Sequence, residues 1–204
     1  MLDVADHWVN AHLLRGQERL QAEQFAAALA DFQTAKTIPD NLPSDVRRSG
    51  GRDAELAYLV GLACQGLGDP ENAKQSWQEA AESPPPGEHG RGAGGFVARR
   101  AVQRYFRALA YRKLGQDDQA TAIFRELVKV GSQGQPDPEA ESAPPSGARQ
   151  SARTRLAAVH YVAGLGHLGL GETEQATAEF KQALAASPDH LGASTSLRRL
   201  ESER

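Results

Sequence analysis

A pattern of small and aromatic residues that recurs four times is the sequence feature that most constrains the fold. We call its positions the spine. In the last copy the spine is Gly164, Gly171, Ala176, Phe180, Ala183 and Pro188. Aligning the alanine four residues before the aromatic finds three further copies: Gly61, Gly68, Ala73, Trp77, Ala80 and Pro85; Ala108, Gly115, Ala120, Phe124 and Leu127; Gly16, Ala28, Phe32, Ala35 and Pro39. Repetition at fixed offsets predicts one structural unit used four times.

Each spine position has a physical role in a pair of short helices. Small residues such as Gly164 and Ala176 let two antiparallel helices approach closely, while Phe180 fills the seam toward the next pair. Gly171 can adopt the left-handed conformation that ends a helix. In the first copy Glu23 stands where the other copies have this hinge glycine. The sequence therefore predicts four helix hairpins.

This spine resembles that of the tetratricopeptide repeat family. The resemblance implies an all-α fold, a right-handed α-solenoid of four helix hairpins plus a C-terminal capping helix, whose first helices line a concave groove. We expect a single array over residues 1–204. Its predicted parts are repeats at about 3–39, 52–85, 96–131 and 149–188 and a capping helix at 189–201.

The connections between the predicted hairpins are long. They comprise Leu42–Gly51, Pro84–Gly95 and residues 131–148, the last rich in Gly, Pro, Ser and Glu. Such a composition cannot bury enough apolar area to order itself, so we predict a flexible insertion at 131–148. Insertions at one edge of the array offer a second surface. For Gly131–Gly147 we favour the alternative, a tolerated loop without function, because long polar insertions cost little closure entropy.

Composition excludes several classes of partner. The formal net charge of −3 disfavours a general nucleic-acid binder, which needs a basic surface. No apolar run approaches the ~20 residues of a membrane span, and the N-terminus lacks a signal-peptide pattern. We therefore expect a cytoplasmic protein without nucleic-acid or membrane partners. The one cysteine, Cys64, falls at a seam-facing helical position and is interpreted as a buried, inert thiol.

No catalytic, metal or cofactor site is predicted. The segment Gly90–Gly95 superficially resembles a phosphate loop but lacks a preceding strand and a Lys-Ser/Thr pair, so a loop is favoured. His160 and His167 are seven residues apart on one predicted helix. They are interpreted as seam histidines in preference to metal ligands. The sequence therefore predicts a protein that is not an enzyme and carries no metal or cofactor.

The candidate partner groove is a set of tyrosines and leucines at equivalent positions. Each tyrosine stands three residues before a spine residue and each leucine one after it, so the two share a helix face that lines the concavity in the family's geometry. The set is Leu13, Gln17, Tyr58, Leu62, Tyr105, Leu109, Arg112, Tyr161 and Leu165. Such a surface suits an apolar or aromatic-rich segment. The alternative is that these tyrosines are buried against each other or against the connectors.

A basic stripe of Arg100, Arg104 and Arg107 is the sharpest departure from the family, which usually has apolar residues at the last two positions. We favour pairing with carboxylates of the second repeat, such as Glu79 or Glu82. A role in binding an anion is the alternative.

The leading functional prediction is a non-enzymatic protein–protein interaction module that binds a peptide or helix in its groove, with a homodimer possible. Asp6–Trp8, Ala108–Gly115, Gly164–Gly171 and Pro188–His190 also resemble the C-terminal repeat region of large bacterial proteins with an uncharacterised N-terminal domain. This second resemblance implies the alternative function, an accessory or oligomerisation tail of a parent chain whose N-terminal domain is related to carbohydrates. The partner would then be another domain of that chain.

Overall fold

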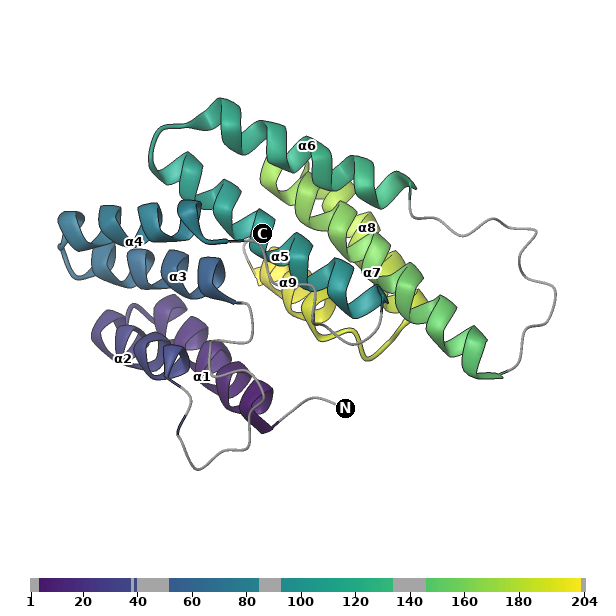
Figure 1. Cartoon of the computed structure of the whole chain (residues 1–204), viewed down its shortest axis with the longest axis horizontal. Coiled ribbons are helices and arrows are strands. Elements are labelled where there is room, and N and C mark those ends of the chain that lie inside the picture. Colours follow the sequence, from purple (N-terminus) through teal and green to yellow (C-terminus); the bar gives the residue numbers. More distant parts are fainter. Residues whose placement is uncertain (1–3, 38, 40–51, 85–92, 134–145, 203–204) are drawn as a thin grey trace. The chain divides into compact units, whose positions relative to one another are not determined.

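The computed structural model describes residues 4–37, 39, 52–84, 93–133 and 146–202. Within these ranges the chain forms nine α-helices and no β-strand (Figure 1). The prediction of an all-α helical-repeat fold is therefore confirmed. The helices are α1 (Val4–Gln21), α2 (Phe25–Lys36), α3 (Asp53–Gly66), α4 (Pro70–Glu82), α5 (Ala93–Lys113), α6 (Asp117–Gln133), α7 (Ser146–Leu170), α8 (Thr173–Ala186) and α9 (Leu191–Ser202).

The chain divides into two compact units. The first comprises residues 1–86 and 106–120, and the second comprises residues 87–105 and 121–204. Helix α1 packs on α2, α2 on α3 and α3 on α4 in the first unit, while α7 packs on α8 and α8 on α9 in the second. Helices α5 and α6 contribute residues to both units. The single array over residues 1–204 stays a prediction.

A small residue of the first helix lies directly against the aromatic of the second in three of the pairs. A Cβ added at Gly16 would lie 2.4 Å from the Phe32 ring, and one added at Gly164 would lie 2.4 Å from Phe180. At Gly61 it would lie 2.3 Å from Nε1 of Trp77. Real Cβ atoms do not approach so closely, so a side chain here would push the two helices apart. The spine glycines thus set the distance between paired helices.

The hinge between paired helices has the same left-handed backbone in all four copies. Gly68 and Gly115 have φ of 76° and Gly171 has φ of 79°. Glu23 in the first copy also has a positive φ, 57°, although it carries a side chain. A Cβ at the three glycines would meet nothing within 4 Å. The backbone conformation, and not a lack of space, is therefore what favours glycine at the hinge.

Helix α9 occupies the position of the predicted capping helix. Its Ala193 and Leu200 are buried, whereas Leu191 at its start is exposed. Gly192 lies against Tyr161 of α7, where an added Cβ would be 2.7 Å from the ring. The helix therefore covers apolar surface of the last pair with one side and leaves its other side polar, as the end of a helical repeat requires.

The predicted connections fall largely outside the described residues. Leu42–Gly51 lies there entirely, and so does most of Pro84–Gly95. The predicted flexible insertion, 131–148, needs a correction at both ends, because α6 continues to Gln133 and α7 begins at Ser146. At the first of these ends, Gly131 lies against Ala163 of α7, which anchors the last turn of α6 by packing.

Candidate partner-binding surfaces

Two of the three predicted groove tyrosines lie in the seams between helices. Tyr105 is 5% exposed and Tyr161 is 9% exposed. The Tyr105 ring packs on Phe124 with centroids 5.8 Å apart, and the Tyr161 ring packs on Phe180 at 5.9 Å. Tyr58 is half-buried and packs on Phe106 at 5.7 Å. The expectation of an exposed tyrosine ladder is therefore wrong at Tyr105 and Tyr161, because each ring fills space beside a neighbouring aromatic.

The remaining residues of the predicted groove differ in their accessibility. Leu13 and Leu165 are buried, at 2% and 3% exposure, and cannot form a floor that a partner touches. The accessible or half-buried members are Gln17, Tyr58, Leu62, Leu109 and Arg112. Arg112 is exposed and lies 3.9 Å from the Asp117 carboxylate. A partner groove built from this reduced set stays a prediction.

The arginines of the basic stripe have different surroundings. Arg100 is exposed, while Arg104 pairs with Glu126 of α6. Nε of Arg107 donates a hydrogen bond of 3.1 Å to the carbonyl oxygen of Ala81, in the last turn of α4. The predicted partner Glu79 is held at 2.9 Å by Lys36 of α2. Arg107 thus binds an unpaired backbone carbonyl at a helix C-terminus, where a cation is favoured by the helix dipole.

The histidines and the cysteine have ordinary structural surroundings. Nδ1 of His160 lies 2.8 Å from Glu179, and that of His167 lies 2.6 Å from Glu172. Across the described ranges, no cluster of three or more His, Cys, Asp or Glu could hold a metal ion. Cys64 is buried, and burial raises the pKa of its thiol, which makes it a poor nucleophile.

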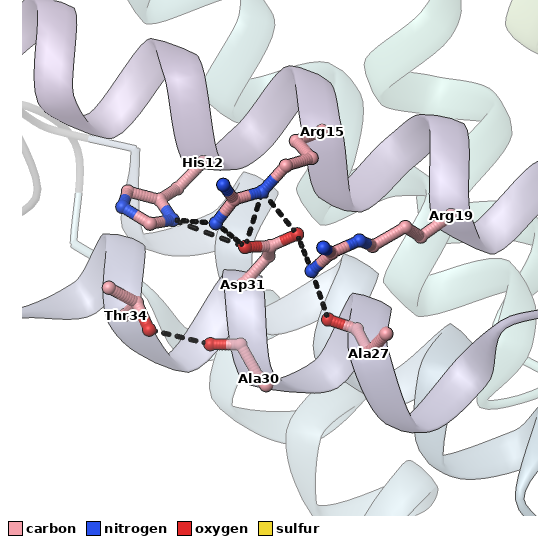
Figure 2. Close-up of polar contacts among 7 residues, drawn as sticks. All are labelled: His12, Arg15, Arg19, Ala27, Ala30, Asp31 and Thr34. Atoms are coloured by element: carbon pink, nitrogen blue, oxygen red, sulfur yellow. Dashed lines mark hydrogen bonds and ion pairs between the residues drawn. The ribbon is translucent and has the colours of Figure 1, made fainter.

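The most concentrated polar cluster joins α1 to α2 around Asp31, and sequence reasoning missed it. Asp31 is 2% exposed, and three side chains of α1 converge on its carboxylate (Figure 2). Arg15 bonds both carboxylate oxygens through Nε, at 3.0 and 3.1 Å, and Arg19 bonds Oδ2 at 2.7 Å. Nδ1 of His12 lies 3.2 Å from Oδ1. The bonds from Arg15 lower the pKa of Asp31, so the carboxylate is held in its charged form.

The fourth pair has a smaller version of this cluster at equivalent positions. His12 and His160 each stand four residues before a spine glycine, and each contacts the acid that immediately precedes the spine aromatic, Asp31 or Glu179. Aligning the copies on their spine would have shown this shared histidine and acid. No pattern in the sequence predicts that Arg15 and Arg19 also bind Asp31, because this contact depends on which side of α1 packs against α2.

Comparisons with known proteins bear on the third repeat. Residues 104–130 match the family model described as Tetratricopeptide repeat. Comparisons with curated proteins and with solved structures found no significant match. The matched residues run from Arg104 in α5 to near the end of α6 and include Tyr105, which packs on Phe124. The match supports the resemblance of this helix pair to a tetratricopeptide repeat.

Within the ranges that the structure describes, no helix is long and apolar enough to cross a membrane.

Proposed function

We propose that the chain is a non-enzymatic protein–protein interaction module that holds a peptide or helix of a partner protein on its first helices. The observation that carries the proposal is the tetratricopeptide match over residues 104–130, since repeats of this family are interaction modules. The packed helix pairs and their spine contacts support it, because a rigid repeat scaffold presents a preorganised surface.

The groove that we propose is smaller than the one expected from sequence. It uses the half-buried side chains Gln17, Tyr58, Leu62 and Leu109 and the exposed Arg112. Tyr105 and Tyr161 are buried beside Phe124 and Phe180 and are left out of the proposed groove. A mixture of apolar side chains and one cation suits an amphipathic segment.

Leu109 offers the most specific test, because it lies in the matched repeat and is half-buried on α5. The experiment is to crosslink the tagged chain in its native cell extract, sequence the captured proteins, and repeat the capture with Leu109→Gln. The matched control is Leu67→Gln, since Leu67 is 48% exposed just after α3 and lies outside the proposed groove. Thermal melting of each variant corrects the capture for its folded fraction.

The proposal predicts a specific captured protein that is lost with Leu109→Gln and kept with Leu67→Gln, at similar melting temperatures. Equal capture by all three chains would place the binding surface elsewhere. Failure to capture any specific protein would contradict the interaction function. Finding these residues fused to a further domain in one longer polypeptide of the extract, with that domain as the crosslinked partner, would favour the alternative function, an accessory tail of a parent chain.

A further inference from the structure

We propose that the face of α1 formed by His12, Arg15 and Arg19 docks the C-terminal turn of a helix that ends in carboxylates, supplied by a partner protein. The inference rests on the proposed function, because it names the kind of partner that one surface of the module receives. The face of His12, Arg15 and Arg19 contains none of the residues of the proposed groove.

Equivalent positions in later repeats already hold a helix C-terminus. Arg107 immediately precedes the spine residue of the third repeat, and Tyr111 follows it by three. Nε of Arg107 and the hydroxyl of Tyr111 both donate to the carbonyl oxygen of Ala81, at 3.1 and 3.4 Å. Ala81 lies in the last turn of α4, the second helix of the preceding repeat. Two side chains of a first helix therefore hold one free carbonyl of a helix end.

The fourth repeat has the same arrangement with small residues. Ala163 occupies the position of Arg107, immediately before the spine glycine. It lies against Gly131 in the last turn of α6, where an added Cβ would be 2.4 Å from Cβ of Ala163. In both repeats, therefore, this face of the first helix receives the C-terminal turn of the preceding second helix.

In the first repeat the same two positions are occupied by Arg15 and Arg19. Their side chains are 53% and 34% exposed. Among the described residues, neither Nη1 of Arg15 nor Nη2 of Arg19 has a hydrogen-bond partner, and Figure 2 shows both guanidinium groups gathered at Asp31. The donors needed to bind a helix end are therefore present, and the described chain does not use them.

The charge of this face selects an acidic occupant. Two guanidinium groups against one carboxylate leave one positive charge in excess, before any charge on His12 is counted. Asp31 also fixes the orientation of both guanidinium groups, so a partner would meet donors whose side-chain entropy is already lost. Carbonyl groups and carboxylates at a helix C-terminus complement such donors.

The test uses the whole chain and two synthetic helices. One is a fluorescein-labelled, alanine-rich peptide of roughly 16 residues with glutamates in its last turn and a free carboxyl terminus, long enough to populate a helix. The other has the same length with glutamines and an amidated C-terminus. Fluorescence anisotropy should show the acidic peptide binding at least about tenfold more tightly, with the difference shrinking as salt is added.

Variants of the chain locate the binding. Arg15→Gln should weaken binding of the acidic peptide about fivefold. Arg125→Gln, at an exposed arginine of α6, is the matched control and should leave binding unchanged. Arg15→Lys keeps the charge and guards against misfolding, and it should give an intermediate affinity because lysine lacks the planar fork. Amide chemical shifts should move in α1 and α2.

Four results would overturn the inference. They are equal affinity for the two peptides, no effect of Arg15→Gln, shifts confined to other helices, and no binding of either peptide. A dimer in sedimentation that Arg15→Gln abolishes would instead identify a second copy as the occupant. None of these outcomes depends on the Leu109 capture experiment, so the inference and the proposed function fail separately.

Discussion

The first and fourth helix pairs share one packing device and differ in what surrounds it. In both, a glycine of the first helix lies against a fully buried phenylalanine of the second, Gly16 on Phe32 and Gly164 on Phe180. Beside this contact the first pair has the charged cluster around Asp31. The fourth pair has only His160 with Glu179 at the equivalent positions, and Tyr161 between Phe180 and His190. The shared contact sets the distance between the two helices of each pair, and the residues around it depend on what each pair packs against.

The residues around the shared contact differ with the elements that pack against each pair. Tyr161 is buried partly because Gly192 of α9 lies on its ring. Arg15 keeps half of its side chain exposed while it holds Asp31, whereas its equivalent in the fourth pair, Ala163, packs against Gly131 of α6. The fourth pair therefore has apolar residues where α6 and α9 cover it, and the first pair has a charged residue on an exposed face.

The largest expected difference between the pairs is the cost of neutralising the acid. Asp31→Asn should lower the free energy of unfolding by about 2 kcal/mol at pH 7, because charge-assisted hydrogen bonds from two arginines are weakened. Glu179→Gln should cost less, about 0.5 kcal/mol, since it removes the charge from a single contact and leaves an amide oxygen that can still pair with His160. Urea unfolding of both variants measures the difference. Equal costs would show that the Asp31 cluster stabilises the first pair no more than the single contact between His160 and Glu179 stabilises the fourth.

The same comparison has a pH dependence with a defined sign. The folded pKa of Asp31 lies below its unfolded value, so its contribution is fully present above the unfolded pKa, near about pH 4. It is lost as the pH falls through the folded value. Asp31→Asn should therefore flatten the loss of stability below about pH 4. An unchanged acid limb in the variant would contradict the role of Asp31.

The hinges offer a second, smaller contrast between the pairs. Glu23→Gly should raise the free energy of unfolding by up to about 1 kcal/mol, because it relieves a side chain from a left-handed backbone. The reverse change in the fourth pair, Gly171→Ala, should lower it by about the same amount. Thermal melting of the two variants checks the sign of each. If Glu23→Gly destabilises the protein, the Glu23 side chain must stabilise the fold by more than its left-handed backbone costs.

The smallest effect concerns the docking of α9 on the fourth pair. Nδ1 of His190 accepts a hydrogen bond of 3.1 Å from the backbone N–H of Ala193, and the imidazole packs at a tilt against the Tyr161 ring, with the ring centroids 4.7 Å apart. Burial lowers the pKa of His190, so its contribution is present above the unfolded pKa, near about 6.5, and is lost as the pH falls through the folded value. Amide hydrogen exchange in α9, corrected for its intrinsic pH dependence, should show more frequent opening below about pH 6.

His190→Asn is the control for this effect. Asparagine keeps an acceptor at the start of α9 but does not titrate. The variant should remove the pH dependence of opening in α9. An identical pH profile in both chains would exclude His190 as its source.

Much of the helical organisation could be predicted from the sequence, because it depends on local spacing. The hinge at Gly171 and the contact of Gly164 with Phe180 follow from which residues allow a left-handed turn and a close helix approach. The α9 helix was also predicted at nearly its observed position. These features need only the periodicity of one helix pair.

The candidate site was predicted less well, because accessibility depends on elements distant in sequence. Tyr161 shares a helix face with Leu165, as expected, but Phe180 and His190 close around its ring. The partner of Arg107 is a backbone carbonyl, which no side-chain pattern reveals. The cluster at Asp31 likewise depends on how α1 faces α2.

The most direct test of this account asks whether Tyr105 and Tyr161 support the fold or touch the partner. The measurement is the melting temperature and the partner capture of Tyr105→Ala and Tyr161→Ala, with each tyrosine changed to Phe as the control. Each alanine variant should lose about 2–4 kcal/mol of the free energy of unfolding, with partner capture unchanged per folded molecule, and each phenylalanine variant should differ little from the natural chain. Lost capture at an unchanged melting temperature would contradict this role and show that the two tyrosines contact the partner.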